Sequence, residues 1–417
     1  MPVLCASNLS DALAPMVLGV LFACAVGCLV YWGAALWQTI STLRSLPTAR
    51  AGLDLPVDED LCVCLVVPAH NEEEALPRLV RSLRAQDLPN ARFVLALDRC
   101  TDGTASAARS AIGDDDRFEI IEVSTCPEDW AGKVNAAWMG VQQSQAARQA
   151  EVLVFTDADC VFEPGCLRAC AALLEARKLD LLSLLSTLRC RHWFEHVCQP
   201  TAMLELMRLF PLHRANRNDG SHRAFANGQF MMFRAEAYHR VGGHEAVREA
   251  LLEDIAFARL MTLPRHGMRT GLLLADGMVR CAMYETWQQF RDGWKRILIE
   301  SCGRKSSRLR SAAWRGRLAS VGLPTGTFLC LLAAVFVSGL SEPVRLGVVG
   351  VSAAGLIVWL TTLVLIARAA HAPVWSVPLH VIGGWLVGAI ELEGACDLVA
   401  GRPTRWGGRE YVLEDRS

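Results

Sequence analysis

The sequence has almost no net charge and few charged residues for its length. Across 417 residues, 42 Lys and Arg nearly balance 43 Asp and Glu, which gives a formal net charge of −1. Without an overall basic field, we expect no nucleic-acid partner. Charged residues make up 20% and hydrophobic residues 52%, with a mean hydropathy of +0.25. This composition excludes a disordered, collagenous or coiled-coil chain and indicates a folded module bracketed by membrane segments.

Several binding signatures are also absent. The chain lacks G-x-G-x-x-G and G-x-x-x-x-G-K-[ST], which disfavours a dinucleotide oxidoreductase or a P-loop NTPase. No two C-x-x-C pairs stand at zinc-finger spacing, although the sequence has 16 cysteines. A chain of this length needs no disulfides to fold. We therefore interpret the cysteines as small buried hydrophobic residues in a reducing compartment.

Lys and Arg are missing from residues 1–43, where a long apolar run predicts a membrane helix. About 20 helical residues cross the hydrocarbon layer, and the run is too long, with too little basic charge before it, for a secretory signal. We expect an N-terminal anchor at 1–45. Three more apolar stretches, 318–340, 346–367 and 374–392, predict a C-terminal membrane region at 318–400.

The distribution of basic residues predicts the orientation. Arg44 and Arg50 follow the first apolar run, and a basic linker precedes the second at Arg304, Lys305, Arg308, Arg310, Arg315 and Arg317. Because positive charge stays in the cytoplasm, we expect a multi-pass protein of the inner membrane with a cytoplasmic module. Four full crossings would put the basic tail, 401–417, outside. Since Glu391 and Glu393 would also be costly at mid-bilayer, we favour a re-entrant or interfacial last stretch over a third C-terminal span.

The region 60–285 alternates short apolar runs with longer amphipathic ones. Strands are predicted at Cys62–Val67, Phe93–Leu97, Glu119–Val123, Val152–Thr156 and Asp180–Ser186. Helices are predicted near Glu73–Arg84, Thr104–Ala111, Val134–Gln145 and Pro164–Ala176. This alternation predicts an α/β fold with a mostly parallel sheet covered on both faces, whose ligands bind at the carboxyl ends of the strands.

Polar residues stand where ligands of such a sheet bind. Asp98 ends the second strand, where it has either a ligand-binding or a turn-capping role. Asp157 and Asp159 follow a later strand, and two carboxylates at this spacing suit a hard cation that binds phosphates, although such triplets also arise by chance. Lys133 opens a helix and is either solvated or near a diphosphate. The pair Glu253-Asp254 starts an amphipathic helix, whose dipole alone would favour acids there.

The run 286–299 combines aromatic, apolar and basic residues at helical spacing. Trp287, Phe290 and Trp294 recur every three or four residues, with Arg and Lys between them. Such a helix suits a membrane interface, so we expect 286–317 to be an interfacial helix with a basic linker. A site closed by it would lie at the bilayer surface.

In order and spacing, these motifs resemble the inverting family 2 glycosyltransferases with a GT-A (Rossmann-like) fold. Within that family the likeness is to membrane-anchored transferases that glycosylate lipids, namely ceramide glucosyltransferase and the carotenoid and hopanoid-associated enzymes. It rests on Asp98, Lys133, Asp157-x-Asp159, Glu253-Asp254 and Gln288-x-x-Arg291, on the runs 227–234 and 241–244, and on the tail 406–411. No single motif is specific, but five in order are.

The resemblance implies a role for each matching residue. The nucleotide sugar would be bound by Pro68, His70, Asn71, Glu72, Asp98, Lys133, Asp157, Gln288 and Arg291. Asp159, with Asp157, would hold Mg²⁺ or Mn²⁺, and Asp254 would be the general base beside Glu253. The acceptor region would include Asn227, Gly228, Gln229, Trp287 and Trp294.

The sequence departs from the family pattern at two places. Leu97 stands where the family often has the first of two aspartates. The usual Q-x-x-R-W is Gln288-x-x-Arg291-Asp292 here, with the tryptophan displaced to Trp294. A register that uses Arg296 instead of Arg291 therefore stays open.

The chemistry of glycosyl transfer explains why such an enzyme needs a metal site and a carboxylate base. A divalent cation stabilises charge on the departing diphosphate, and a carboxylate takes the proton of the attacking hydroxyl. One base without a carboxylate nucleophile gives single displacement and inversion. We therefore interpret the chain as a membrane-bound transferase that moves a hexose, glucose from UDP-glucose, onto a lipid hydroxyl. The alternatives are a polyprenyl-phosphate glycosyltransferase, a processive polysaccharide synthase, or a non-catalytic membrane scaffold with a sugar-nucleotide fold.

Overall fold

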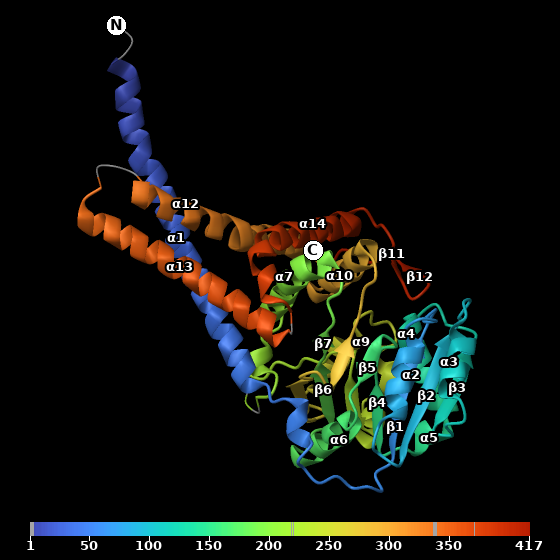
Figure 1. The fold of residues 1–417 in the computed structure, drawn as a ribbon. Coiled ribbons are helices and arrows are strands. Elements are labelled where there is room, and N and C mark those ends of the chain that lie inside the picture. The colour runs from blue at the N-terminus through green and yellow to red at the C-terminus, as the bar shows by residue number, and fades with distance from the viewer. Residues whose placement is uncertain (1–3, 218, 220, 337–339, 371) are drawn as a thin grey trace.

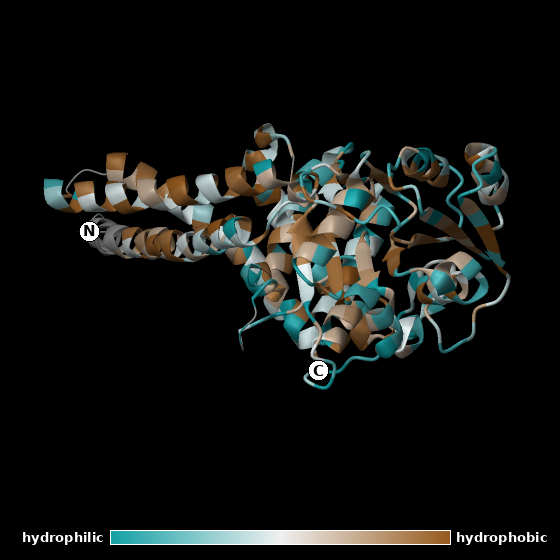
Figure 2. Cartoon of the chain, turned by 90° about the horizontal axis from the view of Figure 1, so that it is seen from below, coloured by the Kyte–Doolittle hydropathy of each residue, from teal (hydrophilic) through white to brown (hydrophobic). Residues whose placement is uncertain are grey.

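The computed structural model describes residues 4–217, 219, 221–336, 340–370 and 372–417. An α/β module lies beside long helices that project away from it (Figure 1). Figure 2 shows that the projecting helices carry apolar residues over most of their length, whereas hydrophilic residues are spread over the outer helices of the module.

A seven-stranded sheet of order β3-β2-β1-β4-β8-β6-β9 forms the centre of the module. Its strands are β1 (Val63–Ala69), β2 (Ala91–Asp98), β3 (Phe118–Val123), β4 (Val152–Phe155), β6 (Leu181–Leu185), β8 (Met231–Arg234) and β9 (Thr270–Leu274). Strand β8 runs antiparallel to β4 and β6, and the other neighbouring pairs are parallel. The predicted α/β class with a mostly parallel sheet is confirmed.

A smaller sheet of order β5-β10-β7 borders the central one. It consists of β5 (Cys160–Phe162), β10 (Val279–Cys281) and β7 (Thr187–Leu188). Because β5 begins directly after Asp159, the pairing of Cys160 with Cys281 fixes the backbone beside the predicted metal ligand.

Helices cover both faces of the central sheet. The predicted helices are present as α2 (Leu76–Arg84), α3 (Thr104–Ile112), α4 (Gly132–Gln143) and α6 (Cys166–Ala176). Shorter elements complete the module: α5 (Gln145–Gln149), α8 (Ala235–Arg240), α9 (Glu253–Met261), η1 (Ala49–Gly52), η2 (Leu212–Arg214) and η3 (Gly243–Val247).

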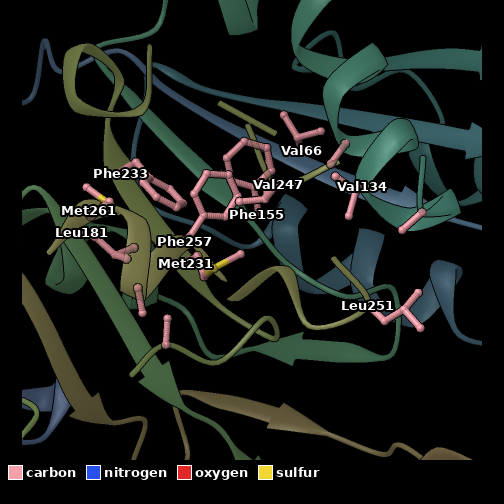
Figure 3. Packing of buried hydrophobic residues seen from close by; sticks show 14 of the residues in the cluster. Val66, Val134, Phe155, Leu181, Met231, Phe233, Val247, Leu251, Phe257 and Met261 are labelled. Atoms are coloured by element: carbon pink, nitrogen blue, oxygen red, sulfur yellow. The ribbon is translucent and has the colours of Figure 1, made fainter. Parts of the chain in front are cut away.

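The core lies on both sides of the sheet because side chains alternate along each strand. On β1, Cys64 and Val66 pack into a cluster with α4 and α9, whereas Leu65 and Val67 pack against α2 and α6. Figure 3 shows the first cluster, where aromatic rings of the sheet and α9 lie near Val66 and Val134. Burial on both faces explains why the central strands are continuous apolar runs.

Three helices outside the sheet pack against one another above the module. They are α7 (Trp193–Leu209), α10 (Trp287–Ser301) and α14 (His380–Val399), which follows η5 (Val374–Leu379). Helix α10 is the run for which we expected a membrane interface, but its apolar face is covered by α7 and α14. Phe290 and Trp294 are buried, and Trp294 donates a hydrogen bond to Gln199 Oε1 at 3.1 Å. The spacing of aromatic and basic residues therefore predicted the helix. Its apolar face, however, packs against other helices of the protein, where we had expected lipid.

The described residues contain four helices long and apolar enough to cross a membrane: Met16–Ser45, Ser306–Phe336, Glu342–Ala369 and Val374–Val399. The first belongs to α1 (Leu4–Ser45), and the third is α13 (Glu342–Ala369). The second is one continuous helix made of α11 (Ser306–Arg317), η4 (Leu318–Gly322) and α12 (Leu323–Phe336). The fourth consists of η5 and α14. Helices α1, α12 and α13 pack together, whereas α14 packs mainly on α7, α10 and α11 (Figure 1).

Two acidic residues of α14 face a cation of a neighbouring helix. Lys295 of α10 lies 2.8 Å from Glu393 and 2.7 Å from Asp397. Helix α14 therefore joins the membrane region to α10 through charged as well as apolar contacts.

The C-terminal tail folds back onto the module as a two-stranded hairpin, β11 (Thr404–Trp406) and β12 (Arg409–Tyr411). No disulfide is present among the described cysteines, most of which are buried or half-buried, in agreement with their interpretation as small core residues.

Candidate active site

A cavity of about 890 Å³ lies at the carboxyl ends of β1, β2 and β4. Its lining brings together most of the predicted site residues: Pro68, His70, Asn71, Glu72, Asp98, Lys133, Asp157, Asp159, Asn227, Gly228, Gln229, Glu253, Asp254 and Gln288. Parallel strands direct their carboxyl ends to one edge, so residues far apart in sequence meet there.

The loops at this edge contain unusual backbone. Asn71 follows β1 with φ +56°, and Arg99 follows β2 with φ +46°. Residues other than glycine rarely adopt this left-handed conformation, which costs of order 1–3 kcal/mol and is concentrated at functional sites. His70 Nδ1 donates to the carbonyl of Asp98 at 2.6 Å, because a carbonyl only accepts. Its Nε2 is left as an acceptor.

Asp98 is already engaged by a cation. Arg99 donates to both carboxylate oxygens of Asp98, at 2.8 and 2.6 Å, and the Asp98 side chain is 3% exposed. Asp98 therefore lines the cavity as half of an ion pair rather than as a free carboxylate.

Lys133 lies between two acidic residues of the cavity. As the second residue of α4, it places Nζ 2.6 Å from Asp157 Oδ1 and 2.5 Å from Glu253 Oε1. Although burial acts to lower the pKa of Lys133, the two carboxylates raise it above the usual value, so the ammonium stays charged. The loop after β4 and the start of α9 are thereby joined through one cation.

Asp254 is held by backbone amides on the wall formed by α9. Its carboxylate accepts from the N–H of Gly228 at 2.8 Å and from that of Ile255 at 2.7 Å. Burial, and then the charge of Glu253, raise the pKa of Asp254 to about 6. The close approach favours glycine, because a Cβ at position 228 would make tight contacts with Lys133 Nζ at 3.1 Å and Glu253 at 3.2 Å.

The neighbours of Gly228 are turned into the protein. Gln229 donates to Cys281 Sγ at 3.0 Å, and its carbonyl accepts from Thr156 at 2.7 Å. Asn227 donates to the carbonyl of Leu184 at 3.0 Å. In the structure these amides fix the loop that positions Asp254.

Three acids in the loops after β1 and β4 repel one another. Burial first, and then the charges of Asp159 and Asp157, raise the pKa of Glu72 to about 7. Burial and Asp157 likewise raise the pKa of Asp159 to about 7. Crowded oxygen ligands of this kind fit a hard divalent cation. Asp159 also lies near the thiols of Cys160 and Cys281, but burial raises the pKa of Cys281 well above its usual value, so that thiol stays protonated.

Not every predicted residue reaches the cavity. Arg291 is absent from its lining and lies 3.4 Å from Asp292 and 3.7 Å from Glu393. Trp287 stacks on Trp193, and Trp294 is buried between helices. Five residues further along α10, Arg296 does line the cavity, so the placement favours the alternative register.

The sequence interpretation missed one hydrogen-bond donor in the lining, Tyr284, and left a second, Arg296, as an alternative. The hydroxyl of Tyr284 and the Nε of Arg296 are buried and have no hydrogen-bond partner among the described residues. Arg296 also donates through Nη1 to the carbonyl of Leu251 at 2.6 Å and lies over the ring of Trp406. Tyr284 carries no motif signal, since it stands alone between β10 and α10.

The tail hairpin contributes a further wall that the predicted roles did not include. Arg405, Trp406, Gly407 and Gly408 line the cavity. Two glycines between short polar and aromatic runs are a hairpin signal, but nothing in the local sequence says where that hairpin packs.

Comparison with known proteins defines the class. Residues 64–242 match the family model Glycosyl transferase family 2, so the chain carries a family 2 glycosyltransferase domain, in agreement with the expected GT-A fold. The match contains β1 to β8 and ends before α9.

Among individual proteins, the chain is similar to 4,4'-diaponeurosporenoate glycosyltransferase of Staphylococcus aureus. The protein of strain MRSA252 is 26% identical over 256 residues, which is 60% of this chain and 64% of the relative. That of strain USA300 is 25% identical over 256 residues, with the same coverage of 60% and 64%. The match therefore spans less than two thirds of the length of these curated relatives.

Two solved structures resemble the model loosely. Mannosyltransferase PcManGT from Pyrobaculum calidifontis, in complex with GDP-Man and Mn²⁺, has a TM-score of 0.45 and 16% identity, covering 90% of this chain and 98% of its own. TarS 1–349 of S. aureus has a TM-score of 0.38 and 13% identity, with coverage of 85% and 97%.

Proposed function

We propose that this chain is a membrane-bound inverting glycosyltransferase that moves a hexose from a nucleotide-diphosphate sugar to the hydroxyl of a lipid. We take UDP-glucose as the donor and the cytoplasmic face of the inner membrane as the place of reaction. The observation that carries the proposal is the position of Asp254, a half-buried carboxylate with a raised pKa that shares one cavity with Lys133 and three crowded acids.

Asp254 has the properties of a general base. A carboxylate that two amides hold at a cavity wall is fixed in direction, and a pKa of about 6 makes it a better proton acceptor than a free aspartate. Glu253 is held by Lys133, so it stays charged and helps to keep the pKa of Asp254 high. With one base on this wall, the acceptor hydroxyl displaces the diphosphate directly and the anomeric configuration inverts.

The acids in the loops after β1 and β4 suit the donor diphosphate. Asp157 and Asp159, with Glu72 beside them, would hold Mg²⁺ or Mn²⁺ through hard oxygen ligands. The bound ion would stabilise charge on the departing diphosphate as a Lewis acid. Arg296 and Tyr284, whose buried donors have no partner among the described residues, would donate to the same anion. Gln288, more than two turns before Arg296 on α10, lines the same cavity.

Two features favour a lipid acceptor. The cavity is lined on one side by α10, which packs directly under the membrane-length helix α14. Exposed tryptophans occur on α14 and on the helices packed against it, at Trp193, Trp314, Trp375 and Trp385, and tryptophan is enriched where protein meets the membrane–water interface.

The direct test is incubation of membranes containing the protein with labelled UDP-sugars, followed by mass spectrometry of the lipid extract. We expect a hexosylated lipid that is lost with Asp254→Asn and retained with Asp114→Asn, an exposed acid on a distant loop. Label in a water-soluble polymer would contradict the lipid assignment. Full activity of Asp254→Asn would point instead to a phosphate acceptor, which needs no base.

A further inference from the structure

The C-terminal hairpin ends in a turn that only glycine adopts easily. Gly407 and Gly408 connect β11 and β12 with φ values of +55° and +71°, as a two-residue turn of this kind requires. Both glycines line the cavity, so bare backbone faces the space between the sheet and α10.

The hairpin is fastened on both sides of the cavity. On one side, Arg409 donates through Nη1 to the carbonyls of Pro127 and Trp130, at 2.9 and 2.8 Å. The hydroxyl of Tyr411 accepts from the N–H of Gly132 at 3.1 Å. On the other side, Trp406 lies under Arg296 of α10, with the guanidinium carbon 4.3 Å from the ring centroid. The hairpin therefore bridges the loop before α4 and helix α10.

The tip of the hairpin lies on the ends of β1 and β2. A Cβ at position 408 would come within 2.4 Å of His70 Nε2, the free acceptor of that ring. A Cβ at Gly132 would have Asp98 Oδ2 at 3.4 Å and the Gly407 carbonyl at 3.6 Å as neighbours. The tip thus adjoins the residues expected to contact the base, while Trp406 adjoins Arg296 at the diphosphate end.

We propose that this hairpin is part of the donor site. The Gly407–Gly408 tip forms the wall against the nucleobase of a nucleoside diphosphate, and Trp406 holds Arg296 in place beside the diphosphate. Glycine suits such a wall because its backbone lets a planar base approach closely. The buried hydroxyl of Tyr284, which lines the same cavity without a partner among the described residues, marks the polar ligand this wall would enclose. The inference rests on the proposed function, because it takes the ligand to be the sugar donor.

The test compares two glycines that have similar backbone but different surroundings. Gly408→Ala would push the tip away from His70, whereas Gly401→Ala, at φ +61° with no other atom within 4 Å of the new Cβ, carries similar strain outside the cavity. We expect titration calorimetry of the full-length protein in detergent, with UDP and Mn²⁺, to show at least tenfold weaker binding for Gly408→Ala. Gly401→Ala should stay within twofold of wild type.

A second variant and a second measurement guard against misfolding. Arg409→Ala removes an anchor of the hairpin and does not alter the cavity lining, and it should also weaken UDP binding. In the wild type, UDP should slow hydrogen exchange at 404–411. If wild type binds UDP but Gly408→Ala and Arg409→Ala bind it equally well, and exchange at 404–411 is unchanged, this inference is wrong while the proposed function stands. If wild type binds neither UDP nor GDP in the presence of Mn²⁺, the proposed function itself fails.

Discussion

Asp254 is the residue whose ionisation should control the reaction rate. A general base acts only as the carboxylate, and its pKa is raised to about 6. Activity should therefore be present above pH 6 and fall about tenfold per pH unit below it. Asp254→Asn should lower kcat by about 10²–10⁴-fold. The measurement is kcat/KM from pH 5 to 8, and a flat profile across that range would rule out the assignment.

Lys133 should be needed for stability as well as for binding. With Lys133→Met, Glu253 is left buried without its cation, at a cost of roughly 1–3 kcal/mol. Although burial acts to raise the pKa of Glu253, Lys133 holds it below its usual value. The stabilisation is thus present above the pKa of an unfolded glutamate and is lost in acid. Thermal unfolding in detergent should show a larger deficit at about pH 7 than at about pH 3, which lies below the pKa of an unfolded glutamate, and Lys133→Met/Glu253→Gln should recover part of the deficit at the higher pH. An equal deficit at both pH values would argue against this charge pair.

The sequence predicted the site residues that stand directly after a strand or at the start of a helix, but not the contacts that those residues make. Asp157, Asp159 and Lys133 could be placed because they follow strands or open a helix of a recognisable parallel sheet. The ion pair between Asp98 and Arg99 could not be predicted, since residues that are neighbours in sequence need not form an ion pair. Nor could Arg296 be chosen over Arg291, because both fit one helix and only packing against α14 decides which reaches the cavity.

The contact between α10 and α14 shows how a helix can satisfy acids within an apolar segment. Lys295, 12% exposed, meets both Glu393 and Asp397, whereas Arg402 reaches the same Asp397 at 3.4 Å but is 69% exposed. Lys295→Met should cost roughly 1–3 kcal/mol because it leaves the buried Asp397 with only the exposed Arg402 as a partner. Arg402→Met should cost less than about 1 kcal/mol. Comparable melting temperatures for the two variants in detergent would contradict this account.

At the level of elements, periodicity predicted the helices and strands of the parallel half of the sheet with ends close to those observed. It did not predict β8, which runs antiparallel, or α7, whose Pro200 interrupts the pattern. The apolar face of α10 was assigned to lipid because a sequence shows that a face is apolar but not whether protein or lipid covers it.

In the whole molecule the tail packs on the module, so we expect both to lie on one side of the membrane. Tyr411 and Arg409 contact the loop before α4, and Asp415 accepts from the N–H of Ser306 at 3.0 Å. If α12 and α13 both cross the membrane after the module, the second crossing returns the chain to the side on which the module lies. If α14 also crossed, the tail could not reach the module. The packing of α14 on α7, α10 and α11 therefore supports the interfacial or re-entrant arrangement, and local hydropathy could not decide this.

Labelling with a membrane-impermeant maleimide tests this topology. In a background with the exposed Cys62 and Cys396 replaced by Ser, Ser341→Cys lies between α12 and α13 and should react in intact spheroplasts. Val412→Cys, at a site 68% exposed in the tail, should react only after the membrane is opened. Labelling of Val412→Cys in intact cells would mean that α14 crosses, and the hairpin could then form no part of a cytoplasmic site. The tail forms one wall of the cavity, so the cavity can form only if the tail lies on the same side of the membrane as the module. That requires the chain to cross the membrane an odd number of times.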